Sequence, residues 1–127
     1  MNLAAVTYLV KDYDEAKKWF VDVLQFTLLE DTALTVNKRW VRVGSNTSGT
    51  CFLLAKANGE SQQVAVGKAA GGRVAYFLHT NDFEKSYAQM LSKGVKFREA
   101  PRQEVYGKVA VFEDLYGNLW DLIEPLT

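Results

Sequence analysis

The sequence contains few of the side chains that most often bind metals or form covalent links. Its 127 residues include one histidine, one cysteine and two prolines. Because a single cysteine cannot form an intramolecular disulfide, we expect a protein of a reducing compartment, the cytoplasm. Any metal site would depend almost entirely on Asp and Glu side chains, since only one His and one Cys are present.

Net charge and long apolar segments are also lacking. Fifteen Lys and Arg residues balance fifteen Asp and Glu residues, and the sequence pI is about 6.6. Nucleic acids and anionic membranes bind surfaces with a local excess of positive charge, so neither is expected as a partner. No segment approaches the roughly 18 consecutive apolar residues of a membrane helix, and no secretion signal is recognisable.

The composition that remains is typical of a folded domain. Apolar residues make up 48% of the chain and charged residues 24%. This provides enough apolar surface for a packed core and argues against disorder. The length favours a single domain spanning residues 1–127.

The same succession of predicted elements occurs twice. An apolar, β-branched run at 3–10 predicts a strand, and a helix capped by Asp12 or Asp14 follows it. A polar connection at 56–72 precedes a second strand and helix, at 74–80 and 82–92. The remaining predicted strands are 26–30, 39–43 and 50–55 in the first half, and 95–98, 108–112 and 119–123 in the second.

An offset of 68 residues aligns the two halves and indicates an internal duplication. It superposes Val6 on Val74 and Phe52 on Trp120. The prediction is an α+β fold of two βαβββ repeats, with repeat one at 1–57, a linker at 58–72 and repeat two at 73–125. Since each repeat has one helix for four strands, one face of each sheet stays uncovered and offers a groove for a small ligand.

The most specific pattern lies near the end of the chain, where residues 112–124 read FEDLYGNLWDLIE. Together with the paired repeats, it resembles the vicinal-oxygen-chelate superfamily, which includes glyoxalase I, extradiol dioxygenases, fosfomycin-resistance enzymes and bleomycin-binding proteins. The resemblance implies a U-shaped mixed sheet around a cavity, the glyoxalase/bleomycin-resistance-like fold. It also implies a homodimer, and leaves open whether the cavity forms within one chain or across the dimer.

The resemblance also locates the positions at which enzymes of this superfamily hold a divalent metal. They correspond here to Ala5, to Leu53 or Leu54, to Ala75 or Arg73, and to Asp121. Only Asp121 supplies a carboxylate, and one carboxylate does not complete the coordination shell of a divalent ion. The sequence is therefore more similar to the bleomycin-binding branch, which binds its ligands without a metal, and no cofactor is expected.

Asp121 is the strongest candidate for ligand contact. Strand alternation puts it on the opposite face from Trp120, among apolar neighbours, where an unpaired carboxylate is costly. Arg42 and Arg73 are the candidate partners for its charge. A structural ion pair and a ligand contact are equally compatible with this pattern.

The other candidate ligand-binding residues are a histidine and several aromatic residues. His79, the only imidazole, ends the predicted strand at 74–80, and a hydrogen bond to a neighbouring turn is favoured there over a role as base or ligand. The loop at 100–107 carries Pro, Gly and mixed charges, and is either a rim of the groove or a solvated connection. The aromatic candidates for the groove are Trp40, Phe77, Tyr106 and Trp120.

Three functions are compatible with these residues. The leading hypothesis is a metal-free protein that binds a small aromatic or toxic molecule in the sheet cavity. The alternative is a metal-dependent enzyme of the glyoxalase or dioxygenase type, with a rebuilt site that uses Asp121, His79, and Glu113 or Glu124. A dimeric accessory or regulatory module is the third.

Overall fold

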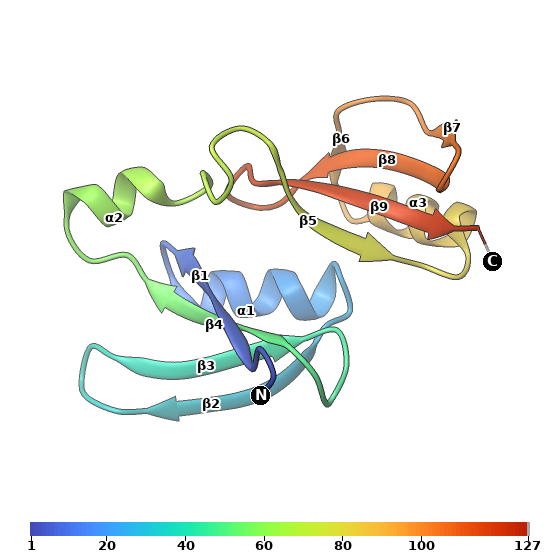
Figure 1. Cartoon of the computed structure of the whole chain (residues 1–127). Coiled ribbons are helices and arrows are strands. Elements are labelled where there is room, and N and C mark those ends of the chain that lie inside the picture. Colours follow the sequence, from blue (N-terminus) through green and yellow to red (C-terminus); the bar gives the residue numbers. More distant parts are fainter. Residues whose placement is uncertain (127) are drawn as a thin grey trace. The chain divides into compact units, whose positions relative to one another are not determined.

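The computed structural model describes residues 1–126, which divide into two compact units, Met1–Val66 and 67–126. Each unit contains one mixed sheet and repeats the order strand, helix, strands (Figure 1). The predicted α+β class with two βαβββ repeats is confirmed. Within residues 1–126, none of the helices combines the length and the hydropathy needed to cross a bilayer.

In the first unit a four-stranded sheet packs on one helix. Its elements are β1 (Ala5–Val10), α1 (Tyr13–Asp22), β2 (Thr27–Ala33), β3 (Arg39–Gly44) and β4 (Cys51–Lys56). The spatial order is β1-β4-β3-β2, with β1 parallel to β4 and the other pairs antiparallel. Asp12, one of the two predicted caps, starts α1 by accepting a hydrogen bond from the Glu15 amide at 2.9 Å.

In the first unit, alternate side chains of each strand face α1. Tyr8 and Leu54 are paired neighbours on this side, and both are fully buried. The Phe20 ring of α1 meets the Tyr8 ring edge-on, with 5.1 Å between the ring centres. Burial of each such side chain stabilises the fold by about 1.5–3 kcal/mol, so this side holds the core and the opposite side is left uncovered by α1.

The second unit follows the same plan. Its elements are β5 (Val74–His79), α3 (Phe83–Ser92), β6 (Lys96–Phe97), β7 (Arg102–Glu104), β8 (Gly107–Glu113) and β9 (Leu119–Pro125). The order is β5-β9-β8-β6, with β5 parallel to β9, and β7 pairs with β8. A continuous row of aromatic rings links α3 to the sheet. Its members are Phe83, Tyr87, Phe97, Phe112 and Trp120.

Two segments that the sequence predicts to be plain connections contain regular structure. A short helix, α2 (Glu60–Ala65), lies inside the predicted linker, and its Gln62 side chain accepts a hydrogen bond from the Asn58 amide at 2.8 Å. The strand β7 lies inside the predicted loop 100–107 and pairs with β8 as a hairpin. Both elements are short and polar, so apolar periodicity gives no signal for them.

Candidate functional site

The FEDLYGNLW pattern forms the turn between β8 and β9, and its acidic residue is saturated with hydrogen bonds. Asp114 is 6% exposed. Its Oδ1 accepts from the amides of Tyr116 and Asn118, each at 3.0 Å. Its Oδ2 accepts from Asn118 Nδ2 at 3.1 Å and from Trp120 Nε1 at 3.0 Å. The Asp114 carboxylate therefore fixes the turn and the start of β9, which is a structural role.

The same turn also holds the segment that leads into β5. Asn118 Oδ1 accepts a hydrogen bond from the Ala69 amide at 3.0 Å. Gly67 has φ = +80° and lies so close to Tyr116 that a Cβ atom would clash with the Tyr116 carbonyl oxygen. Glycine is the residue that tolerates both this φ and this approach. The turn thus positions β5 and β9 next to each other.

Asp121 lies on the side of the second sheet that α3 does not cover, which we call the open face of the second unit. Trp120 and Leu122 are buried on the α3 side, and Asp121 alternates away from them. Its register partners are Phe77 on β5 and Val111 on β8, so these share the open face. Asp121 is 7% exposed, and its Oδ1 has no hydrogen-bond partner within residues 1–126.

The electrostatic surroundings of Asp121 come from the segment around β7. Burial raises the pKa of Asp121, the charge of Arg102 lowers this pKa, and the charge of Glu99 raises it. Arg102 Nε donates to Glu104 Oε1 at 2.8 Å, and Arg102 Nη1 pairs with Glu99. The nearby guanidinium is therefore shared between two other carboxylates. Sequence reasoning missed this group, and its only signal was the mixed charge of residues 99–104.

The two arginines that the sequence predicts as partners of Asp121 have other surroundings. Arg42 on β3 donates to Glu30 Oε1 at 3.0 Å, and its Nη1 lies 3.7 Å from Cys51 Sγ. Arg73 is exposed just before β5. Within residues 1–126, Asp121 Oδ1 accepts no hydrogen bond from either arginine. The choice between a structural ion pair and a ligand contact for Asp121 therefore stays a prediction.

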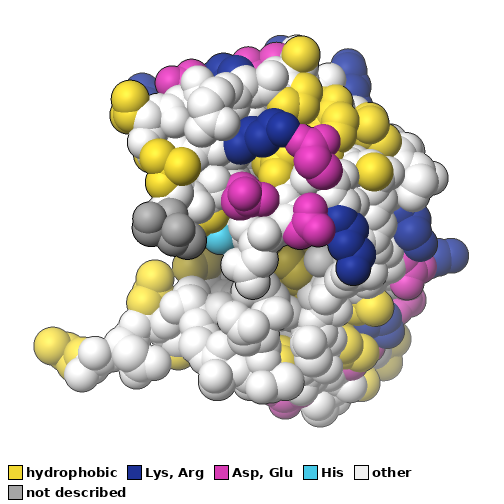
Figure 2. All heavy atoms as spheres, turned by 90° about the vertical axis from the view of Figure 1, so that its right-hand side faces the viewer, with side chains coloured by type: hydrophobic (Ala, Val, Ile, Leu, Met, Phe, Trp, Pro, Cys, Tyr) yellow, Lys and Arg dark blue, Asp and Glu magenta, His cyan; other side chains and the backbone are white. Residues whose placement is uncertain are grey.

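Phe77 and His79 share the open face of the second unit with Asp121. Phe77 pairs with Asp121, and His79 pairs with Ile123 two residues further along β5. The Phe77 side chain is 63% exposed, although it is a large aromatic residue. His79 is also exposed, and Figure 2 shows part of its imidazole, the only cyan group, at the molecular surface. The structure thus brings three of the predicted residues to one face.

The other predicted residues lie elsewhere. Trp40 and Arg42 are neighbours on β3 of the first unit, where Val41 faces α1 and is fully buried. Arg42 pairs with Leu53 on β4, so Leu53 is on the side of the first sheet away from α1. Tyr106 lies in the turn between β7 and β8 and is 46% exposed.

The strand register shows which residues occupy the metal-ligand positions that the superfamily implies, and therefore whether they could coordinate a divalent ion. Leu54 is buried on the α1 side, so Leu53 is the residue that corresponds to Asp121 on the uncovered side. The partner of Leu53 on β1 is Thr7, and the partner of Asp121 on β5 is Phe77. No group of three or more His, Cys, Asp or Glu in residues 1–126 is arranged to hold a metal ion. The donor set therefore does not fit a divalent metal.

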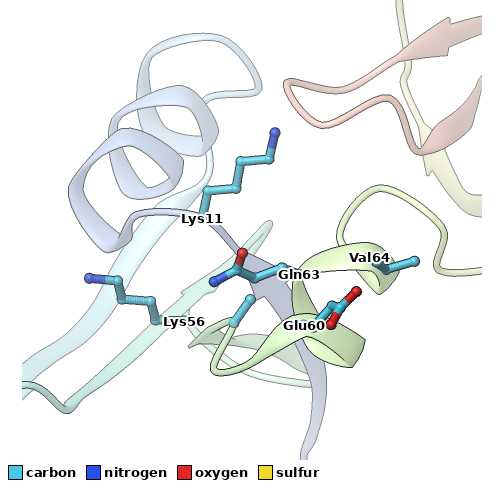
Figure 3. Close-up of a pocket in the computed structure, with 6 residues that line it drawn as sticks. Lys11, Lys56, Glu60, Gln63 and Val64 are labelled. Atoms are coloured by element: carbon cyan, nitrogen blue, oxygen red, sulfur yellow. The ribbon is translucent and has the colours of Figure 1, made fainter.

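A surface pocket of about 510 Å³ is present in the first unit, at the ends of β1 and β4. Its lining residues are Lys11, Lys56, Ala57, Glu60, Gln63 and Val64. Figure 3 shows the Lys11 and Lys56 side chains pointing in different directions, with the Gln63 amide between them. Because the lining mixes both charges and its ammonium groups diverge, it lacks the convergent polar groups of a specific site.

Comparison with known proteins agrees with this architecture. A 47% identical relative from Shewanella frigidimarina, described as an uncharacterized protein, matches 97% of this chain and 93% of its own length. The crystal structure of UcmS2 is 26% identical, with a TM-score of 0.83 and 98% of each chain covered. The crystal structure of TnmS3, an antibiotic binding protein from a Streptomyces species, is 23% identical, with a TM-score of 0.76 and coverage of 99% and 97%.

The family model described as Glyoxalase/Bleomycin resistance protein/Dioxygenase superfamily matches residues 2–122. This range includes the first sheet, β5 to β8, the turn between β8 and β9, and the first part of β9. It also includes the four positions examined for metal ligands. The chain therefore belongs to the Glyoxalase/Bleomycin resistance protein/Dioxygenase superfamily.

Proposed function

We propose that this protein binds a small, partly aromatic molecule without a metal, and that the open face of the second unit supplies the main contacts. One observation carries the proposal. A buried Asp121 oxygen has no hydrogen-bond partner in the described residues, and the register partner of Asp121 on β5 is Phe77, an exposed aromatic residue. Binding sites for small molecules typically combine apolar surface with a few polar groups that fix orientation.

The energetics support a ligand at this position. An exposed phenylalanine gains about 1.5–3 kcal/mol when its surface is removed from water. A buried polar atom without a partner costs about 1–3 kcal/mol, and a ligand donor removes that cost. The similarity to TnmS3, described as an antibiotic binding protein, is consistent with the proposal. His79 and Tyr106 of the second unit are further proposed contacts, and Trp40 and Arg42 stay candidate ligand contacts of the first sheet.

A thermal-shift screen tests the proposal directly. The chain is screened against a library of aromatic and heterocyclic compounds, with and without EDTA, and its metal content is measured by elemental analysis. A ligand at 100 times its Kd is expected to stabilise the folded state by about 2.7 kcal/mol. The shift in Tm is expected to be insensitive to EDTA.

Two results would contradict metal-free binding. A stoichiometric divalent ion, with metal-dependent turnover of a hemithioacetal or a catechol, would favour an enzyme with a rebuilt site. A library without a single hit, together with one stoichiometric protein partner, would favour an accessory or regulatory module. Either outcome replaces the proposal.

The oligomeric state and the cellular compartment are further parts of the proposed function. We infer a homodimer in a reducing cytoplasm, in which 1–127 forms one vicinal-oxygen-chelate domain with repeats at 1–57 and 73–125 and a linker at 58–72. The lone Cys51 is buried, which is consistent with a reduced thiol. Sedimentation equilibrium is expected to give twice the 14.3 kDa chain mass, and a monomeric mass would contradict the dimer.

A further inference from the structure

We propose that the ligand of the open face is an organic cation, a protonated amine attached to an aromatic body, and that its N–H group binds the Asp121 carboxylate. This inference rests on the proposed function and adds the chemical class of the ligand. Four observations lead to it: the burial of Asp121, the unpaired Oδ1 atom, the excess of negative charge near it and the exposed Phe77 ring.

The charges around Asp121 favour a cation over an anion. Among residues 1–126, Arg102 is the guanidinium that acts on Asp121, and it is already bound to Glu104 and Glu99. Glu99 and Glu104 contact the Arg102 guanidinium directly, and its charge also acts on Asp121, so three carboxylates share one positive charge. An anionic ligand would meet this excess of negative charge, whereas a cation would reduce it.

The other cations near the strand edge reduce this excess without removing it. Lys96 and Arg98 both bind Glu113, each with 3.4 Å between nitrogen and oxygen. Glu113 pairs with Leu119, two residues before Asp121 along β9. Two cations thus share one carboxylate at that end of the sheet. Together with Arg102, Glu99, Glu104 and Asp121 these residues make three cations and four carboxylates, so one negative charge remains in excess on this face.

The position of Phe77 indicates that the ligand also contains an aromatic ring. Phe77 is the β5 residue directly opposite Asp121 in the sheet register, so the two side chains project from neighbouring strands on the same side. A ring attached to the amine can pack on the exposed Phe77 ring while the ammonium group reaches Asp121. The Phe77 face also attracts a cation directly, because the ring carries negative potential on its faces.

A hydrogen bond between an ammonium group and a carboxylate is stronger than one between neutral groups. The experiment therefore uses three probes that share a phenyl ring and a similar chain length: phenethylamine, phenethyl alcohol and hydrocinnamate. They present a cation, a neutral donor and an anion. Binding is measured by NMR titration of the full chain at neutral pH, up to millimolar concentrations.

The variants separate charge recognition from packing. Asp121→Asn keeps the shape of the side chain and removes its charge. Glu84→Gln is the matched control, because it removes one negative charge from α3, where Glu84 pairs with Lys108 on the opposite side of the sheet. Loss of a charged hydrogen bond is expected to weaken amine binding by about ten- to a hundredfold in Asp121→Asn. Alcohol binding is expected to change little, and Glu84→Gln is expected to bind all three probes like the wild type.

Each other outcome overturns the inference in a recognisable way. If hydrocinnamate bound as tightly as the amine, or if Asp121→Asn lowered the affinity for all three probes equally, Asp121 would not distinguish ligands by their charge. Absence of shifts with the amine would also refute it. If the thermal-shift library yields ligands that are neutral or anionic, the cation inference fails while the proposed function stands; if it yields none, both fail.

Discussion

The turns at corresponding places in the two repeats differ in chemistry. The offset of 68 residues matches Asn46 and Gly49, between β3 and β4, with Asp114 and Gly117, between β8 and β9. Gly49 and Gly117 have nearly identical φ angles of 90° and 91°. In the second repeat the buried Asp114 accepts hydrogen bonds from three residues, whereas Asn46 is exposed. A buried carboxylate therefore fixes the turn of the second repeat, whereas the turn of the first repeat forms with an exposed side chain at the corresponding position.

The strands after these turns also differ, because a carboxylate again occurs only in the second repeat. Leu53 and Asp121 occupy equivalent positions on β4 and β9, on the side that the helix leaves uncovered. Leucine at this position has no polar atom to satisfy, but Asp121 is buried with Oδ1 unpaired in the described structure. Asp114 and Asp121 are almost equally buried. Burial of a carboxylate is therefore no argument for function by itself, and our proposal for Asp121 depends on the missing hydrogen-bond donor.

Replacing Asp114 by Ala is expected to have the largest effect. It removes acceptors from the amides of Tyr116 and Asn118 and from the Trp120 indole. Since each lost partner of a buried group costs about 1–3 kcal/mol, the free energy of unfolding is expected to fall by about 3–5 kcal/mol. Urea denaturation followed by far-UV circular dichroism measures the change.

The matched control for this variant is Asn46→Ala in the turn of the first repeat. Because Asn46 is exposed, its loss is expected to change the free energy of unfolding by about 0.5 kcal/mol or less. If the two substitutions lowered the free energy of unfolding equally, the hydrogen bonds of Asp114 would not make its turn more important for stability than the turn at Asn46.

The second expectation concerns the pH dependence of stability. Because burial raises the pKa of Asp121 above its ordinary value of 3.8, its ionised form is less favourable in the folded state. Its contribution to stability is therefore greatest below pH 3.8 and decreases as the pH rises through the folded-state pKa. At pH 7, Asp121→Asn is expected to stabilise the unliganded chain by about 1 kcal/mol, because no charge is then buried.

Asp31 on β2 provides the opposite case. Hydrogen bonds from Arg39 at 2.7 Å and Lys17 at 2.8 Å lower its pKa to about 2. Its stabilising contribution is present above pH 3.8 and is lost as the pH falls toward 2. Asp31→Asn is therefore expected to destabilise the chain at neutral pH. Chemical denaturation between pH 2 and 7 measures how each Asn substitution changes the free energy of unfolding. If both substitutions changed it in the same direction, the contrast between a paired and an unpaired carboxylate would be contradicted.

Strand alternation and the 68-residue offset were sufficient to predict the repeated fold and the face that carries Asp121. Parity along β9 depends only on local chain geometry, so it could be read from the sequence. The groups near Asp121 could not, because Arg102 reaches this face through the pairing of β7 with β8, and a three-residue polar strand has no periodic signal. The role of Asp114 was also missed, since side-chain hydrogen bonds to a turn leave no apolar pattern.

The ends of the two helices give the smallest expected effect. After α3 the chain turns at Gly94, with φ = +83°, and after α1 it turns at Gln25, with φ = +59°. A side chain in this left-handed region costs about 1 kcal/mol relative to glycine, but glycine also makes the unfolded chain more flexible. Gln25→Gly is therefore expected to stabilise the chain by about 0.5 kcal/mol in the same urea assay. Destabilisation instead would mean that the Gln25 side chain makes contacts worth more than the backbone strain, and that the first repeat ends its helix by a different means from the second.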